Sequence, residues 1–204
     1  MSLESLSPEQ QEAFKDRLKE LRMDPAKVLS EISPDTHQGP IVLSIDPDRS
    51  HVPPHHVTVD SIDEVKRIAG NPDADFESGK MQEHHQIPPD CPSEILAADP
   101  GTLNADQNAM VDLAERAYIY GNSARVASWR EAIDRHRFPV TFAVFAAESV
   151  CLDSSNSPLI IDSHSAHNFG TLKVCKGGWI QVAENGTMTI QNFVRCEGSD
   201  CSSC

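Results

Sequence analysis

The sequence is short of basic residues, of aromatic residues and of long apolar runs, and each shortage narrows its possible functions. Lys and Arg number 17 against 31 Asp and Glu, which leaves a formal net charge of −14. Phosphate binding needs clustered Lys and Arg, so we expect no nucleic-acid partner and no anionic membrane surface. No apolar run approaches the roughly 18 residues of a membrane span. The first nine residues lack a basic region followed by an apolar core, which predicts no secretory signal and a cytoplasmic protein.

The familiar catalytic motifs are also missing. The sequence contains no G-x-S-x-G elbow, no phosphate-binding loop, no G-x-G-x-x-G turn and no H-E-x-x-H pair. Three carboxylates that flank expected strands, Glu148, Asp153 and Asp162, are the remaining candidates for an acid–base pair. Carboxylates at strand ends are more often solvating groups, so an enzyme of unidentified class is the weaker hypothesis.

Local patterns predict helices before strands. Ser7-Pro8-Glu9-Gln10 is a well-formed helix start with a capping box, and a second short helix is expected from Asp24 to Ile32. Apolar segments at 41–45 and 56–59, followed by a capped helix at 61–70, predict a small β-β-α unit. The stretch from 71 to 101 has turn chemistry and little periodicity, which predicts a linker or an extended segment. Two amphipathic helices should follow at 104–121 and 123–137.

The strongest pattern is a glycine repeat in the last third of the chain. Gly170-Thr-Leu-Lys-Val, Gly178-Trp-Ile-Gln-Val and Gly186-Thr-Met-Thr-Ile begin eight residues apart. Because side chains alternate along a strand, the apolar residues of each copy should share one face. That set is Leu172, Val174, Ile180, Val182, Met188 and Ile190. Two geometries fit the spacing: an antiparallel meander with glycine turns, or a β-solenoid with a glycine at each corner.

Residues 148–193, with this G-x-apolar-x-apolar spacing, resemble the parallel β-helix and bactofilin-type β-solenoid proteins. The resemblance implies a stacking or scaffold role and carries over no catalytic residue.

Cysteines at the end of the chain offer the sharpest local chemistry. Cys201 and Cys204 form a C-x-x-C pair, and Cys196 lies five residues earlier. Thiolates at this spacing can converge on a soft ion, so we expect a zinc or copper site. Cys175, His164 or His167 would complete its ligand set. Disulfide formation and an inert tail are the alternatives, although a reducing compartment favours thiols or metal ligands.

Together these patterns predict an α+β protein with four segments. They are an N-terminal helical and β-β-α region (1–70), the Pro/His-rich linker (71–101), a helix pair packed on a Gly-punctuated β-sheet or short β-solenoid (102–195), and a Cys-rich tail (196–204). The leading functional hypothesis is a non-enzymatic module that assembles with itself or another protein through the β domain. Alternatives are a metal-binding protein, a precursor of a modified Cys-rich peptide, and the unidentified enzyme.

Overall fold

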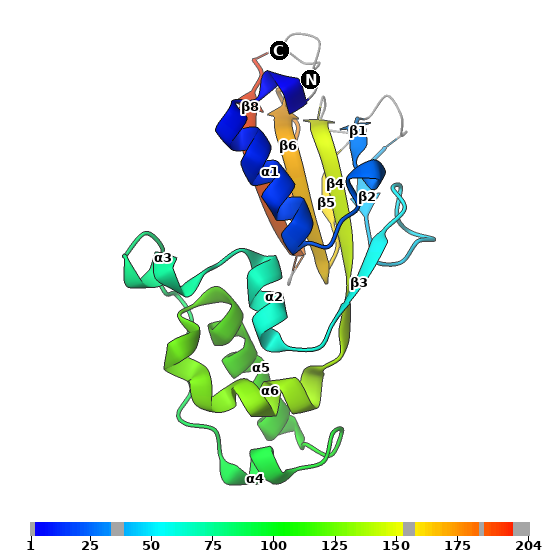
Figure 1. Ribbon diagram of the computed structural model, residues 1–204. Coiled ribbons are helices and arrows are strands. Elements are labelled where there is room, and N and C mark those ends of the chain that lie inside the picture. Colours follow the sequence, from blue (N-terminus) through cyan, green and yellow to red (C-terminus); the bar gives the residue numbers. More distant parts are fainter. Residues whose placement is uncertain (1–2, 34–38, 153–157, 184–185, 198–204) are drawn as a thin grey trace. The chain divides into compact units, whose positions relative to one another are not determined.

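The computed structural model describes residues 3–33, 39–152, 158–183 and 186–197 (Figure 1). The chain forms two compact units: unit 1 comprises Met1–Val57 and Thr141–Cys204, and unit 2 comprises Thr58–Val140. Unit 2 is therefore inserted, in sequence, between the two parts of unit 1. The predicted boundaries at 70, 101 and 195 concern which segments fold by themselves, and they stay a prediction.

Unit 1 contains one α-helix and two parallel sheets, so the predicted mixture of helices and strands is confirmed. Its helices are the 3-10 turns η1 (Leu3–Ser5) and η2 (Pro25–Lys27) and the helix α1 (Pro8–Glu20). The strands of the larger sheet, in spatial order, are β1 (Leu29–Ile32), β4 (Val140–Leu152), β6 (Ser165–Val174) and β8 (Gly186–Arg195), with β3 (His55–Val59) also paired to β4. The smaller sheet has the order β2 (Ile41–Leu43), β5 (Leu159–Ile161) and β7 (Ile180–Val182).

The chain alternates between the two sheets. β4 belongs to the larger sheet and β5 to the smaller one. β6 then joins the larger sheet, β7 the smaller one and β8 the larger one. Each new strand pairs in parallel with the strand two places earlier, as in Phe145↔His167↔Met188. The pairs β2–β5 and β5–β7 are parallel as well. The antiparallel meander is therefore wrong for the repeat, because successive strands join different sheets.

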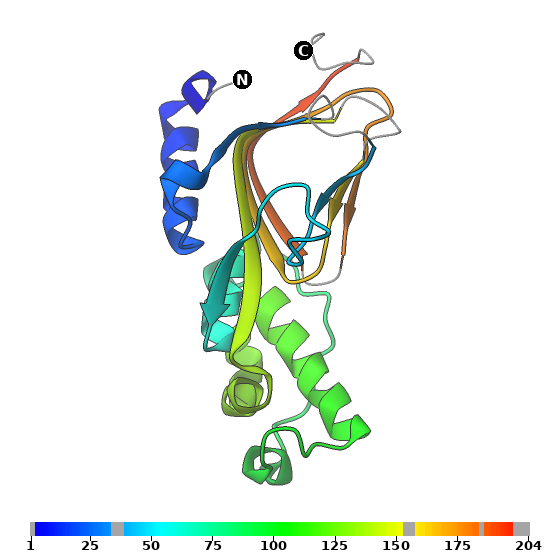
Figure 2. The ribbon, with the colours of Figure 1, turned by 90° about the vertical axis from the view of Figure 1, so that its right-hand side faces the viewer.

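The core of unit 1 lies between the two sheets, which face each other in Figure 2. Phe145, Phe169 and Leu172 of the larger sheet pack in one cluster with Ile41 and Ile161 of the smaller one. Of the six apolar repeat residues, Leu172 is buried in this cluster, and Val174, Ile180, Met188 and Ile190 pack against it. The predicted common face is confirmed for these five, whereas Val182 is exposed.

Helix α1 covers the other face of the larger sheet (Figures 1 and 2). The predicted capping box is present, because Ser7 accepts from the Gln10 backbone and the Gln10 side chain accepts from the Ser7 backbone. Phe14 and Leu18 are buried, and the Asn168 side chain donates to the Phe14 carbonyl at 3.0 Å. The apolar stripe of this helix is therefore part of the core.

The helix predicted from Asp24 to Ile32 is wrong. After the single turn η2, residues 29–32 extend as β1 and pair in parallel with β4, Leu29 opposite Ala147 and Ile32 opposite Val150. The four residues gain backbone partners on β4, and Ile32 enters the core between the sheets. Pairing with a distant strand thus overrides a local pattern that fits a helix equally well.

The β-β-α unit is also corrected. The strands predicted at 41–45 and 56–59 exist as β2 and β3, but β2 joins the smaller sheet and β3 pairs with β4 of the larger one. The helix expected after them is present as α2 (Ile62–Ala69), which ends at Gly70 with φ 75°. The local elements were predictable, whereas their partners lie about a hundred residues away in sequence.

Unit 2 is built from helices. They are α2, α3 (Asp73–Glu77), α4 (Ser93–Ala97), α5 (Ala105–Tyr120), the 3-10 helix η4 (Ser123–Trp129) and α6 (Arg130–Arg137). The helix predicted at 104–121 is confirmed, with Asn104 and Gln107 forming its capping box. The one predicted at 123–137 is divided into η4 and α6. The predicted linker carries the two short helices α3 and α4. Whether the helix pair packs on the β domain stays a prediction.

Candidate functional site

The last strands of both sheets form an open edge, which we call the terminal edge: β7 and β8 with Gly178 and Trp179, which precede β7. β8 pairs with β6 and β7 pairs with β5. Within the described ranges, neither strand has a partner on its outer side. In β8, a strand of ten residues, the Gln191 and Thr187 carbonyls accept from the Gln10 and His167 side chains, and the other groups of its outer side have no strand partner among the described residues.

Exposed apolar side chains gather on this terminal edge. Trp179 is 45% exposed, Val182 is 47% exposed and Phe193 is 59% exposed. No other large hydrophobic side chain of the described residues is exposed to this degree. Trp179 precedes β7, Val182 ends it, and Phe193 lies on β8 opposite Leu172. Within the described residues, no further strand follows β8 or β7 in its sheet to cover these side chains.

The terminal edge is also nearly uncharged. From Gly178 to Arg195 the only ionisable side chains are those of Glu184 and Arg195, although charged residues make up 24% of the chain. Edge strands that must stay alone usually carry Lys, Pro or an inward-pointing charge. β8 has a single cation at its last residue and no proline. Nothing in the composition of β8 opposes pairing with another strand.

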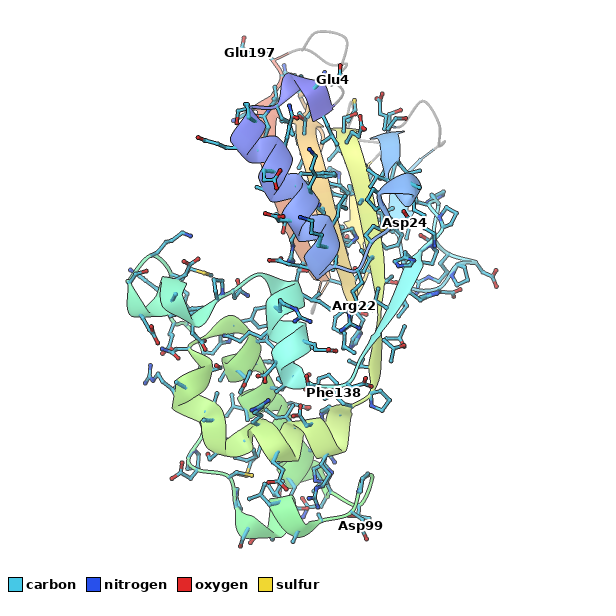
Figure 3. All side chains as sticks on the ribbon, in the orientation of Figure 1. Glu4, Arg22, Asp24, Asp99, Phe138 and Glu197 are labelled. Atoms are coloured by element: carbon cyan, nitrogen blue, oxygen red, sulfur yellow. The ribbon has the colours of Figure 1, made fainter. Side chains whose placement is uncertain are left out.

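Three cysteines lie at the carboxyl ends of strands of the larger sheet. Cys151 is the penultimate residue of β4, and Cys175 and Cys196 directly follow β6 and β8. Cys151 and Cys196 each take part in a disulfide, whereas Cys175 carries a thiol. Cys175 and Cys196 line one cavity of about 700 Å³ together with Lys176, Arg195 and Glu197, the last of which is labelled in Figure 3.

The predicted metal ligands are only partly brought together. Cys175 and Cys196 share the cavity, and Cys201 and Cys204 lie outside the described residues. Among the residues that are described, no group of three or more His, Cys, Asp or Glu side chains is placed to hold a metal ion. In the disulfide form Cys196 has no thiolate to offer, so a zinc or copper site there would require reduction. The site stays a prediction.

The two histidines of the predicted set occupy different environments. His164 follows β5 with φ 54°, and its ring lies 5.9 Å from that of Phe142. His167 is fully buried on β6, stacked on Phe145 with ring centroids 5.2 Å apart. Its Nδ1 donates to the Thr187 carbonyl at 2.9 Å, which leaves Nε2 as the unprotonated nitrogen, and Nε2 has no hydrogen-bond partner. Burial lowers the pKa of His167 to about 4, so the ring is neutral at pH 7.

The carboxylates considered for acid–base chemistry are engaged in structural contacts. Glu148 accepts from the Leu3 backbone at 3.3 Å. Asp162 accepts from the Ser44 hydroxyl at 2.9 Å and pairs with Arg49 at 3.3 Å. Burial raises the pKa of Asp162, but the hydrogen bonds from Ser163 and Ser44 and the nearby Arg49 outweigh it and hold the pKa below its usual value. Asp153 lies outside the described residues. Glu148 and Asp162 share no recorded hydrogen-bond or ion-pair partner, so the described contacts do not join them as an acid–base pair.

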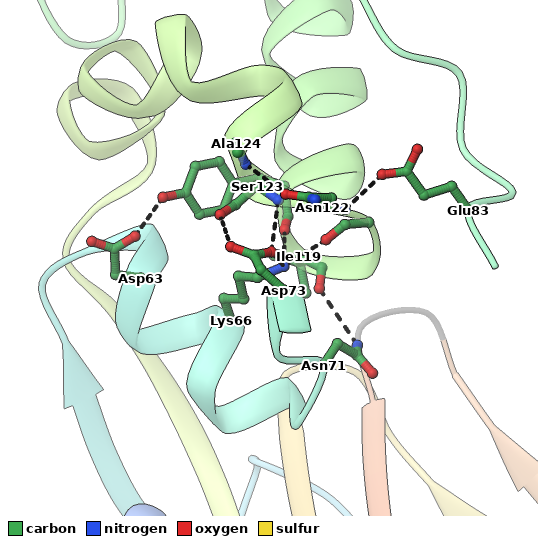
Figure 4. A network of polar contacts seen from close by, with 11 residues as sticks. Asp63, Lys66, Asn71, Asp73, Glu83, Ile119, Asn122, Ser123 and Ala124 are labelled. Carbon is green, nitrogen blue, oxygen red and sulfur yellow. Dashed lines mark hydrogen bonds and ion pairs between the residues drawn. The ribbon is translucent and has the colours of Figure 1, made fainter. Parts of the chain in front are cut away.

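Unit 2 contains a dense polar network around Lys66 (Figure 4). The ammonium group of Lys66 donates to the carbonyls of Tyr118 and Gly121 at 2.8 and 2.6 Å and pairs with Asp73 at 2.9 Å. Asp73 in turn accepts from the backbone and hydroxyl of Ser123. Lys66 thus satisfies carbonyls at the end of α5, while Asp73 satisfies donors at the start of η4.

The Lys66 network therefore connects the end of α5 to the start of η4 and has a structural role. All three protons of the Lys66 ammonium have an acceptor, which leaves no lone pair or proton for chemistry on a substrate. Burial raises the pKa of Asp73, but the hydrogen bonds from Ser123 and the contact with Lys66 outweigh burial and hold the pKa below its usual value. Asp73 therefore stays ionised. The sequence contained a signal for neither residue, because their partners are backbone carbonyls and amides about 50 residues away.

No protein-family model, no curated protein and no solved structure matches this chain. Among the described residues, no helix combines the length and apolar character that crossing a bilayer requires.

Proposed function

We propose that this protein is a structural module whose terminal edge pairs with the terminal edge of a second copy of the same chain. The observation that carries the proposal is the outer side of β8, which has no strand partner among the described residues, together with the exposed Trp179, Val182 and Phe193 of the terminal edge. In this proposal unit 1 is a short β-solenoid. The alternation of strands between two parallel sheets supports it, because each circuit of such a fold offers its last strands to whatever stacks next.

A second copy fits the chemistry of the terminal edge better than a different partner does. An interface between identical copies with two-fold symmetry must be self-complementary, since the same residues face one another. The terminal edge meets this condition, being apolar and nearly free of charge in a chain that carries −14. A surface that recruits a basic partner would instead display the acidic residues that dominate the rest of the chain.

The pairing geometry follows from the two-fold symmetry. β8 of one copy runs antiparallel to β8 of the other, and the two larger sheets join into one continuous sheet. The backbone groups on the outer side of β8 gain partners, and the exposed parts of Phe193 and Val182 become covered. The role is assembly, and it assigns no catalytic residue.

Sedimentation velocity of the full chain, over about a hundredfold range of concentration, tests the proposal. We expect a concentration-dependent dimer, and we expect Phe193→Lys to weaken it about 10- to 100-fold, because burying one Phe contributes roughly 1.5–3 kcal/mol. Gln82→Lys, which adds the same charge at an exposed site in unit 2, is the matched control and should leave association unchanged.

A non-reducing gel on the same samples separates strand pairing from covalent linkage through cysteine. A wild-type chain that stays monomeric over the whole concentration range would contradict the proposal. Equal weakening by Phe193→Lys and Gln82→Lys would also contradict it, because the effect would then come from charge and not from the terminal edge.

A further inference from the structure

Cys175 and Cys196 are neighbours across adjacent parallel strands. Val174 and Arg195 form the last matched pair of β6 and β8, and the Cys196 amide donates to the Val174 carbonyl at 3.0 Å. The ladder therefore continues by one residue, which sets Cys175 beside Cys196. Adjacent strands lie about 4.8 Å apart. This spacing is inside the range of about 4.4–6.8 Å between Cα atoms that a disulfide requires.

The two cysteines differ in oxidation state. Cys196 is one half of a disulfide and Cys175 carries a thiol, so a nucleophilic sulfur and an electrophilic sulfur line the same cavity. Lys176 and Arg195 line it as well, against one acid, Glu197. The thiolate is the reactive form of a cysteine in disulfide exchange. A structural disulfide accounts for Cys196, but not for a thiol at the neighbouring position of the adjacent strand.

We propose that Cys175 and Cys196 form a thiol–disulfide exchange site at the carboxyl ends of β6 and β8. The Cys175 thiol loses its proton to solvent, and the thiolate attacks Sγ of Cys196. The bond between Cys175 and Cys196 forms as the bond between Cys196 and its present partner sulfur breaks. The electron pair of the broken bond stays on the released sulfur, which takes a proton from solvent. The number of thiols and disulfides is unchanged, so the step needs no oxidant or reductant.

The exchange has a consequence for the larger sheet. A bond between Cys175 and Cys196 would tie the end of β6 covalently to the end of β8, which the present disulfide of Cys196 does not do, because Cys175 carries a thiol. The two bonding states therefore differ in how firmly the last strand is held. The proposal does not depend on self-association.

Disulfide mapping tests the site on the full chain. Trypsin should release Cys151, Cys175 and Cys196 on separate peptides, because Lys173, Lys176 and Arg195 lie between them. Cleavage by a glutamate-specific protease after Glu197 further separates Cys196 from Cys201 and Cys204. The protein is incubated in dilute solution without added thiol or oxidant, trapped with acid and alkylated. We expect a peptide containing Cys175 linked to one containing Cys196. Its rate of formation should rise from pH 7 to pH 8, because only the thiolate reacts.

Cys175→Ser should abolish the linked species and leave Cys196 bonded to its present partner. Cys91→Ser is the matched control, since it removes a thiol in unit 2 and should change nothing. A wild-type chain whose Cys175 is always recovered alkylated and never linked to Cys196 would overturn the proposal, whether or not the Cys175→Ser variant folds. Linkage found only in covalent dimers on a non-reducing gel would also overturn it.

Discussion

A single buried side chain, His167, makes the stability of the two sheets depend on pH. Its ring stacks on Phe145 and lies near Phe169, with Nε2 unpaired in the apolar interior. The folded state disfavours the charged ring, so the pKa of His167 falls from 6.5 to about 4. Below pH 6.5 the unfolded chain takes up a proton that the folded chain does not. The contribution of His167 to stability is therefore fully present above about pH 6.5 and is lost as the pH falls towards about 4.

Replacing His167 with leucine, an apolar residue of similar volume, should remove this pH dependence. The quantity compared is the free energy of unfolding of the variant minus that of the wild type. We expect this difference to be roughly 1.4 kcal/mol larger at pH 5.5 than at pH 8. Hydrogen exchange of peptides from β6 at the two pH values measures the local free energy of unfolding. The substitution of exposed His84 by asparagine is the control. A His167→Leu variant that loses stability with falling pH as steeply as the wild type would refute the burial argument.

Sequence patterns predicted the contacts of individual side chains well where those contacts involve only neighbouring positions in the chain. The Ser7 capping box and the Asn104 cap depend on residues within three positions and are present, whereas the capping box expected at Ser61 is wrong, because Ser61 makes no side-chain cap at the start of α2. His167 had been proposed as a metal ligand on spacing alone, and its burial depends on Phe145, a neighbour only through the parallel register. The same register brings Cys175 beside Cys196 and Cys151 onto the same end of the sheet. No local pattern contains that information.

At the scale of elements, the glycine repeat has a different physical basis from the one that the sequence suggested. Gly170 lies inside β6 and not at a corner, and a Cβ there would lie 2.4 Å from the Glu148 carbonyl oxygen and 3.0 Å from the Leu3 side chain. Glycine is required because the backbone of β4 and the N-terminal turn approach closely. Alternation along the strands was predictable, whereas this close approach comes from segments 22 and 167 residues away.

Gly170→Ala should therefore destabilise unit 1. Because the clash is with backbone, the strands must shift, and we expect a cost of about 1–3 kcal/mol. Gly186→Ala is the matched control from the same repeat, where a Cβ would meet two side-chain methyl groups at 3.1 Å and the Ala183 carbonyl oxygen at 3.2 Å. That variant should lose less unfolding free energy, because the closest of these contacts are with side chains that can move. Denaturant unfolding of the two variants compares them, and an equal or larger cost for Gly186→Ala would refute this reason for Gly170.

At the scale of the whole molecule, net charge and the terminal edge act in opposite directions. Each chain carries −14, so two copies repel one another over distances set by the ionic strength. The charge is concentrated outside the stretch from Gly178 to Arg195, so repulsion acts on approach and the apolar contacts act at short range. The sequence predicted an assembling β domain from composition and the repeat. Which strands lie at the edges of the sheets depends on the order of strands, which the sequence does not reveal.

This opposition predicts how salt changes the proposed association. Raising NaCl from about 20 mM to about 500 mM shortens the screening length from roughly 20 Å to about 4 Å. Repulsion between the two acidic chains is then screened, whereas burial of Phe193 and Val182 is not weakened. We expect the dissociation constant from sedimentation velocity to fall severalfold. Phe193→Lys should shift the whole curve to weaker binding and keep its direction. A dimer that dissociates on adding salt would mean that ion pairs hold the copies together, and the terminal edge would then not be the interface.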